Sequence, residues 1–270
     1  MNKIKGVILD WAGTIVDFGS LAPMGAFVEL FARHRIQISI EQARVPMGLP
    51  KIDHIIALGQ MPDIAAQWQA VVGRPFEAAD ARNLLDEFEP MSAQAALDRS
   101  AFIPGFMPVY QDLKAQGLAF ATTTGYTRKI MTPLIEQAHA QGFDPARVIC
   151  CDDVARSRPD PMGVEQCLQA MHLQGQSSQV IKVDDTAPGL AEGLAAGCWT
   201  VGVAASGNAL GWTYERWQQA QDEEKTRALQ PAVALLQAAG AHEVIDSVAD
   251  LPAAIARIEE LDGSSDRWQP

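Results

Sequence analysis

Short apolar runs that alternate with helical patterns are the feature that most constrains how this chain can fold. Five runs have about the length of a fully buried strand and end in small or polar residues: 5–9, 118–123, 147–151, 179–183 and 198–203. Helical patterns accompany the later runs, at residues 107–116, 127–141, 162–172 and 188–196. Three of these patterns are followed directly by a glycine, which ends a helix because it takes the left-handed conformation at no steric cost. The alternation predicts an α/β fold, with a Rossmann-like parallel sheet and helices on both of its faces.

The spacing of the strands predicts how the chain is divided. About 108 residues separate the first run from the second, which is too long for a single crossover connection. Residues 19–100 carry helical patterns, at 25–35, 64–72 and 78–88, and no clear strand. We therefore expect an inserted helical cap domain at residues 19–100 and an α/β core formed by residues 1–18 and 101–270. A polar helical region at 213–239, a last strand near 242–245 and a final helix are expected to complete the core.

The composition excludes several classes of partner. The chain has 270 residues, of which 48% are hydrophobic and 20% charged, so it can bury a sizeable core. Lys and Arg number 21 and Asp and Glu number 33, which gives a formal net charge of −12. This acidic balance argues against a general nucleic-acid binder and against adhesion to an anionic membrane, since both need a basic face. A small anion could still bind where positive charge, or a metal ion, is concentrated locally.

The cysteines and the N-terminus indicate a compartment. The four cysteines (Cys150, Cys151, Cys167 and Cys198) have no CxxC spacing, and two of them are adjacent in an apolar run. We interpret them as buried thiols in a reducing compartment. The apolar stretch that ends at Asp10 is too short for a signal peptide, and no run approaches the length of a membrane span. A soluble, cytoplasmic protein is expected.

Candidate site residues follow the predicted strands, at the edge where an open α/β sheet binds its ligands. They are Asp10, Ala12 and Thr14 after the first strand, residues 122–126 after the second, Asp152, Asp153, Arg156 and Arg158 after the third, and residues 184–186 after the fourth. Carboxylates that converge without compensation are costly, so a divalent cation with oxygen ligands is expected. Thr124 and Gly125 open a helix and predict an anion site, to which Arg158 could add a fixed positive charge. The set suits phosphoryl transfer.

Four segments of the chain resemble the haloacid dehalogenase superfamily and, within it, the phosphonoacetaldehyde hydrolase (phosphonatase) family. They are DWAGT at 10–14, PMGLPKIDH at 46–54, TTGYTR at 123–128 and VDDTAPG at 183–189. The likeness extends in order over residues 4–204. It implies a Rossmann-like core with an inserted cap, and Mg2+-dependent cleavage of the P–C bond of phosphonoacetaldehyde to acetaldehyde and phosphate in 2-aminoethylphosphonate degradation. It also implies a homodimer formed through the cap domain.

The resemblance also implies roles for particular residues. Asp10 would be the nucleophile that forms an aspartyl phosphate, and Lys51 would form a Schiff base with the substrate. Asp10, Asp184, Asp185 and the backbone carbonyl of Ala12 would bind the Mg2+ ion. Three segments would contact the substrate, through Met47, Gly48, Thr124, Gly125, Tyr126 and Arg158.

Ala12 and Lys51 support this activity by their chemistry. In the superfamily that the chain resembles, most phosphatases carry a second Asp two residues after the nucleophile, and that Asp protonates the leaving oxygen. Ala12 stands at that position and has no proton to give. Cleavage of a P–C bond instead needs a sink for the electrons of the carbon, and an iminium between a lysine and an adjacent aldehyde supplies one. The alanine and the lysine therefore point to the same chemistry.

The residues around Lys51 suit an amine that must be partly neutral to attack a carbonyl. Desolvation lowers the pKa of a lysine, and the neighbours in sequence are apolar: Met47, Leu49, Ile52, Ile55 and Ile56. His54 lies three residues further on, on the same helical face. It is a candidate catalytic residue that could shuttle the protons of imine formation, or it could pack inside the cap.

Two assignments in the site stay open. Arg156 competes with Arg158 for contact with the phosphonate, although the resemblance favours Arg158. Gly189 stands where members of the superfamily often carry an Asp, so Asp184 could complete the metal shell directly or through a water molecule. Asp185 is the more secure metal ligand of the pair.

Two further questions concern partners and function. Phe27, Leu30 and Phe31 share one face of a predicted helix and could meet a partner subunit or the core of the cap itself. An ordinary phosphatase or phosphomutase of the superfamily is an alternative function, and a phosphate-binding regulator without catalysis is another. Ala12 and Lys51 argue against the phosphatase, and a nucleophilic Asp10 argues against the regulator.

Overall fold

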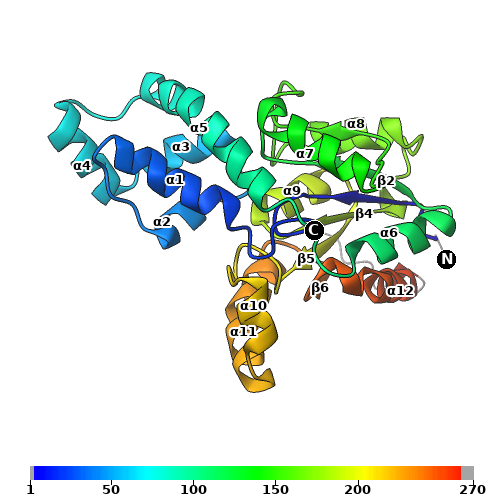
Figure 1. Ribbon diagram of the computed structural model, residues 1–270. Coiled ribbons are helices and arrows are strands. Elements are labelled where there is room, and N and C mark those ends of the chain that lie inside the picture. The colour runs from blue at the N-terminus through cyan, green and yellow to red at the C-terminus, as the bar shows by residue number, and fades with distance from the viewer. Residues whose placement is uncertain (1–2, 263–270) are drawn as a thin grey trace.

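A six-stranded parallel sheet forms the centre of the structure, a computed structural model that describes residues 3–262 (Figure 1). Its strands lie in the order β3-β2-β1-β4-β5-β6. They are β1 (Gly6–Leu9), β2 (Ala119–Thr123), β3 (Val148–Ile149), β4 (Val180–Asp184), β5 (Trp199–Val203) and β6 (Glu243–Ile245). The predicted parallel sheet is confirmed, including its last strand. Strand order reverses beside β1, where a ligand cleft forms in sheets of this kind.

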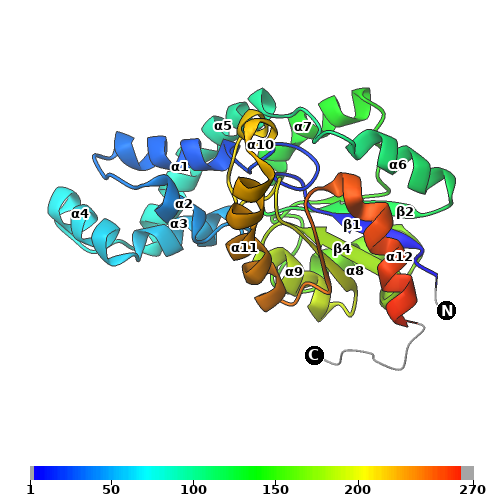
Figure 2. The same cartoon turned by 90° about the horizontal axis from the view of Figure 1, so that it is seen from below.

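Helices cover both faces of the sheet, as the alternating pattern predicts (Figure 2). Val7 and Leu9 of β1 face one side, which is covered by α6 (Phe106–Ala115), α7 (Arg128–Ala140) and α12 (Leu251–Asp262). Ile8 points to the other side. That face carries α8 (Met162–Ala170), α9 (Ala187–Ala195) and α11 (Asp222–Ala238). Two short 3-10 turns, η1 (Ser177–Gln179) and η2 (Val248–Asp250), lie in the connections.

Five helices between β1 and β2 form a helical module, residues 22–98, that lies beside the sheet (Figure 1). They are α1 (Ala22–Arg33), α2 (Ile40–Arg44), α3 (Lys51–Gly59), α4 (Pro62–Val72) and α5 (Ala78–Asp98). The Phe27 ring stacks on Phe88, with 4.2 Å between the ring centroids. Phe27, Leu30 and Phe31 are fully buried. These side chains therefore form the core of the module itself, and they do not lie on a surface that a partner could cover.

Three helical segments differ from the sequence prediction. The helix predicted at 78–88 continues through Pro90 to Asp98. The short α2 has too few residues for a periodic pattern and is fixed by a capping box between Ser39 and Gln42. The polar region at 213–239 divides into α10 (Tyr214–Gln219) and α11, because Ala220 and Gln221 are extended.

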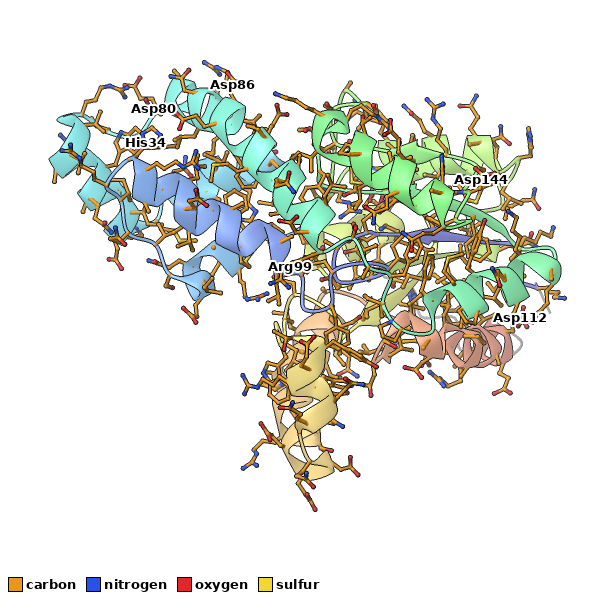
Figure 3. All side chains as sticks on the ribbon, viewed as in Figure 1. His34, Asp80, Asp86, Arg99, Asp112 and Asp144 are labelled. Carbon is orange, nitrogen blue, oxygen red and sulfur yellow. The ribbon has the colours of Figure 1, made fainter. Side chains whose placement is uncertain are left out.

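Two connections join the module to the sheet and run beside each other. The backbone N–H of Ile103 donates to the carbonyl of Ile15 over 2.8 Å, and Val16 pairs with Phe102. Arg99 lies at this junction (Figure 3). The module is thus tied to the core at one edge, where it could pivot.

The surface carries much of the acidic charge. Asp86, Asp112 and Asp144 are exposed and lie on the outside of the module and of the core (Figure 3). Within residues 3–262, no helix combines the length and the apolar character that crossing a membrane requires.

Candidate active site

Three buried carboxylates meet at the carboxyl ends of β1 and β4. The two strands pair directly, with Leu9 opposite Val183, so Asp10 and Asp184 emerge side by side. One carboxylate oxygen from each of Asp10, Asp184 and Asp185 lies within 4.8 Å of the others. The convergence expected from the sequence is present in the structure.

The cluster suits a divalent cation. Burial, and then the charge of Asp184, raise the pKa of Asp10 to about 6. Burial, followed by Asp10 and Asp184, raises the pKa of Asp185 well above its usual range. Asp185 Oδ1 is buried without a hydrogen-bond partner among the described residues, while Oδ2 accepts from the backbone N–H of Asn208 over 2.7 Å. A hard cation with oxygen ligands would satisfy Oδ1 and offset the repulsion.

Asp184 lies in this cluster because Gly189 leaves room for it. A Cβ at Gly189 would lie 1.9 Å from Asp184 Oδ2, so the carboxylate occupies the space of a side chain at 189. Asp184 Oδ2 also accepts from Lys182 Nζ over 2.7 Å, and Oδ1 accepts from the Thr186 hydroxyl over 2.7 Å. Although burial opposes it, the charges of Lys182 and Arg158 hold the pKa of Asp184 below its usual range. The carboxylate is therefore charged and held in place.

Arg158 is the arginine that reaches the cluster. Its NH2 group donates to Asp10 Oδ1 over 2.8 Å and to the Thr123 carbonyl over 2.9 Å, and its Nε donates to Glu192 over 3.0 Å. Arg156 instead pairs with Asp160 on the surface. Sequence reasoning did not find Lys182 and Glu192. The signal for Lys182 was a charged residue in the middle of an apolar strand.

Lys51 approaches the same site from the helical module. It is the first residue of α3, and its side chain is only 3% exposed. Nζ lies 4.8 Å from the centroid of the Tyr126 ring and 5.7 Å from that of Phe27. Burial lowers the pKa of Lys51 to about 8, so roughly a tenth of the amine is neutral at pH 7, far more than for an exposed lysine.

A cavity of about 20 Å³ lies between the module and the core, and both contribute to its walls. It is lined by Asp10, Ala12, Ser20, Pro23, Met47, Gly48, Lys51, Thr124, Gly125, Tyr126, Arg158, Asp185 and Thr186. All six of the predicted substrate-contacting residues are among them. Sequence reasoning placed Thr186 after the fourth strand without giving it a role, and it did not identify Ser20, in the connection after β1, or Pro23, in the first turn of α1.

His54 does not line this cavity. Its ring is buried and stacks on Phe27, with 3.9 Å between the ring centroids. Nε2 lies 2.9 Å from the Ala43 carbonyl. Burial, and then the charge of Lys51, lower the pKa of His54 well below its usual range, so the ring is neutral. The structure places His54 inside the module, one turn from Lys51.

Two glycines let the module lie close against the core. A Cβ at Gly125 would be 2.9 Å from the carbonyl oxygen of Leu49. Gly48 has a positive φ of 91°, and a Cβ there would be 2.3 Å from the Thr186 hydroxyl. The contact between the 46–50 loop and the sheet therefore depends on missing side chains.

Asp152 and Asp153 lie in a separate group on the loop after β3. Asp152 accepts from the backbone N–H of Arg128, at the start of α7. Asp153 pairs with the Arg128 guanidinium and accepts from the backbone N–H of Cys150 over 2.7 Å. These carboxylates fix the loop and do not enter the cavity.

Comparisons with known proteins agree with this geometry. A family model described as haloacid dehalogenase-like hydrolase matches residues 4–197. The phosphonoacetaldehyde hydrolase of Paraburkholderia xenovorans (strain LB400) is 43% identical over 259 residues, which cover 96% of this chain and 97% of that protein. The enzyme of that name from Klebsiella pneumoniae is 44% identical over 260 residues, 96% of each chain.

A solved structure gives the same result. The phosphonoacetaldehyde hydrolase-like protein from Oleispira antarctica superimposes with a TM-score of 0.94 at 40% identity, covering 99% of this chain and 96% of that chain. The parallel sheet and the helical module are therefore shared features. The chain belongs to the haloacid dehalogenase-like hydrolase family and, within it, to the phosphonoacetaldehyde hydrolases.

Proposed function

We propose that this protein is a hydrolase that cleaves the P–C bond of phosphonoacetaldehyde to acetaldehyde and phosphate, in the degradation of 2-aminoethylphosphonate. The observation that carries the proposal is that Lys51 and Asp10, from different parts of the fold, line one small cavity. One side chain suits an aldehyde and the other suits phosphorus. A substrate in which one methylene carbon joins an aldehyde to a phosphonate group could engage both.

The reaction begins at Lys51. Its neutral amine adds to the aldehyde and loses water to form an imine, which is then protonated to an iminium. The Asp10 carboxylate attacks phosphorus, the P–C bond breaks, and its electron pair moves into the iminium to leave an enamine on Lys51. Water then attacks the aspartyl phosphate and releases phosphate. The enamine takes up a proton at carbon, and hydrolysis of the resulting imine frees acetaldehyde and Lys51.

The phosphonate group is bound by fixed donors. Arg158 would contact its oxygens beside Asp10, and Thr124 and Gly125, which follow β2, would add a hydroxyl and a backbone amide. Tyr126, Met47 and Gly48 would enclose the aldehyde end next to Lys51. Since Arg158 is buried, its charge acts in a medium of low dielectric constant, where it stabilises the transferring group more strongly than it would in water.

Mg2+ is the proposed metal, and Asp10, Asp185, Asp184 and the Ala12 carbonyl are its proposed ligands. Four carboxylates are buried around Arg158, those of Asp10, Asp184, Asp185 and Glu192, against the two buried cations Arg158 and Lys182. A divalent ion would offset the excess of negative charge. When bound, Mg2+ would neutralise charge on the phosphoryl oxygens.

The alternatives are an ordinary phosphatase or phosphomutase, and a phosphate-binding regulator. Ala12 lines the cavity where a phosphatase of the superfamily would hold a proton donor. A phosphate-binding regulator does not need a buried lysine whose pKa is lowered to about 8. Both features favour cleavage of a P–C bond through an imine.

A trapping experiment tests the proposal. The protein is incubated with phosphonoacetaldehyde and borohydride, and the reduced adduct is mapped by mass spectrometry. We expect the adduct on Lys51, and loss of phosphate release in Lys51→Ala, whereas Lys129→Ala, an exposed lysine, should behave as the parent. Activity that persists in Lys51→Ala would refute the imine route. Hydrolysis of phosphate monoesters without an adduct would favour the phosphatase.

A second variant separates the two halves of the reaction. Asp10→Ala should lose phosphate release and still form the trapped adduct on Lys51. If phosphate release persists in this variant, Asp10 is not the nucleophile.

We also propose a division of the chain, an assembly and a compartment. The helical module corresponds to a cap domain at residues 19–100 that opens and closes over a core of residues 1–18 and 101–270. A homodimer formed through the cap is proposed, and sedimentation or light scattering would measure it.

The cytoplasm is the proposed compartment, because the four cysteines are free thiols.

A further inference from the structure

One arginine of the helical module binds the backbone of the core. Arg44 is the last residue of α2, and its NH1 group donates to the Asn208 carbonyl over 2.9 Å and to Asn208 Oδ1 over 3.0 Å. The same group donates to the carbonyl of Gly19, in the connection that leads into the module, over 3.2 Å. A third core residue, Gly211, accepts from NH2 over 3.5 Å. All of these acceptors are neutral oxygens.

The loop after β5 is shaped to receive this guanidinium. Gly211 has a positive φ of 63°, and a Cβ there would lie 2.5 Å from Arg44 Cζ. The planar group therefore lies directly against the backbone, which a larger residue would prevent. Arg44 is half-buried, and its guanidinium occupies a space that the absence of a side chain at Gly211 leaves open.

Asn208 connects this contact to the carboxylate cluster. Its carbonyl and side chain accept from Arg44, while its backbone N–H donates to Asp185 Oδ2 over 2.7 Å. Asp185 thus has one oxygen held by the loop, and the other is the unpaired Oδ1. Asn208 therefore links the position of the helical module to the orientation of the Asp185 side chain.

The two reacting side chains are enclosed where the module meets the core. Lys51 and Asp10 line the cavity from the module and from the core, and they are only 3% and 6% exposed. Movement of the module away from the core would expose both side chains to a substrate and would separate Arg44 from its acceptors. Arg44 therefore stabilises the arrangement in which the module lies against the core.

We propose that Arg44 is a positioning residue that holds the helical module closed and, through Asn208, fixes Asp185 for metal binding. Closure and metal binding then favour each other by the same factor, because coupling between two equilibria is reciprocal. The need for the module to open rests on the proposed function, but the test below uses no turnover. Its failure and the failure of the proposed function are therefore distinguishable.

The test measures metal binding and exposure of Lys51 in the full chain. Titration calorimetry gives the Mg2+ dissociation constant, and reductive methylation with formaldehyde and borohydride, mapped by mass spectrometry, gives the rate at which Lys51 becomes accessible. In Arg44→Ala we expect the dissociation constant to rise about tenfold, as for loss of other groups that orient metal ligands. Methylation of Lys51 should accelerate. Mg2+ should slow methylation in the parent protein and lose most of that effect in the variant.

Two control variants separate this link from general loosening. Lys129→Ala removes the ion pair between Lys129 and Glu89, a 2.9 Å contact between α7 and the module that does not reach Asp185. Because Lys129 is exposed, this pair contributes little to closure, and the variant should keep both the Mg2+ dissociation constant and the methylation rate of the parent protein. Asn208→Ala removes one acceptor and keeps the backbone groups, so its effect should be smaller than that of Arg44→Ala.

Two outcomes in Arg44→Ala would contradict this role of Arg44. An unchanged dissociation constant together with an unchanged methylation rate in Arg44→Ala would overturn it. Faster methylation with unchanged Mg2+ binding would refute the link through Asn208. If circular dichroism shows that Arg44→Ala does not fold, Arg44→Lys is measured instead. It keeps the charge but has fewer donors, and a result equal to that of the parent protein would overturn the proposal.

Discussion

The guanidinium of Arg158 donates a hydrogen bond to the Asp10 carboxylate over 2.8 Å, and both side chains are buried. Arg158 lies on the loop after β3 and Asp10 directly after β1, so the contact joins two non-adjacent strands across β2. The positive charge opposes the rise that burial causes in the pKa of Asp10. A nucleophile that must be ionised is thus kept close to a fixed cation.

Replacement of Arg158 tests this relationship. In Arg158→Ala the pKa of Asp10 in the metal-free protein should rise above its value of about 6, because burial then acts with less opposition. Phosphate release should fall about 100-fold or more, as for loss of other donors to developing charge. A 13C NMR titration of the Asp carboxyls measures the pKa. Arg156→Ala, at an exposed site, is the control, and an equal loss of activity in both variants would contradict the assignment.

The rate of imine formation should depend on pH through Lys51. Only the neutral amine attacks an aldehyde, and the pKa of Lys51 is lowered to about 8. The initial rate of borohydride trapping should therefore rise as the pH increases from 6 to about 8 and then level off. Trapping that continues to rise up to pH 10 would indicate an ordinary exposed lysine.

The stability of the folded protein should also depend on pH through Lys51. The folded pKa of about 8 lies below the unfolded value of about 10.5, so the unfolded state binds more protons between these values and stability rises with pH there. Lys51→Met should therefore raise the free energy of unfolding below pH 8, by about 3 kcal/mol. The gain should vanish near pH 10.5. Urea unfolding at pH 7 and pH 10.5 measures both values, and an equal gain at the two would exclude this explanation.

Gly189 should not tolerate a side chain. In Gly189→Ala the new Cβ would displace the carboxylate of Asp184, whose Oδ2 lies 1.9 Å from it, and leave Lys182 buried without its partner. Loss of one member of a buried ion pair costs about 3–5 kcal/mol. Gly25→Ala is the matched control, because Gly25 is also helical but a Cβ there meets nothing within 4 Å. Thermal unfolding compares the two, and similar melting temperatures would argue against the steric role of Gly189.

Removal of metal should destabilise the protein in a pH-dependent way. Without a cation, burial raises the pKa of Asp10 to about 6 and raises that of Asp185 well above its usual range, so these carboxyls favour the folded state only when protonated. The metal-free protein should therefore lose stability as the pH rises through 6. The increase in melting temperature caused by Mg2+ should be larger at pH 7.5 than at pH 5, and EDTA should reverse it. Equal increases at both pH values would contradict this account.

Residues with a local signal were predictable from the sequence. The apolar runs gave the strands of the sheet, and their ends gave Asp10, Thr124 and Asp185, because parallel strands bring their carboxyl ends to one edge. Lys51 was identified because the apolar residues around it and the motif that contains it are continuous in the chain. The long gap after the first strand indicated the inserted helices.

Only the tertiary structure shows which of two nearby residues points into the site. Arg156 and Arg158 are two residues apart in one loop, and only the fold shows that Arg158 turns inward while Arg156 stays on the surface. The contact between Asp184 and Gly189 depends on how α9 lies against β4.

Contacts between segments that are distant in the chain could not be predicted from the sequence either. His54 fills the module, and Arg44 reaches Asn208, which is 164 residues away in the chain. Periodicity tells which face of an element is apolar, whereas these contacts depend on the distances between elements that meet only after folding. The chemistry of the site could therefore be predicted from short continuous motifs, because each motif lies within a few residues of the chain. The fold determined which of the available side chains reach the site.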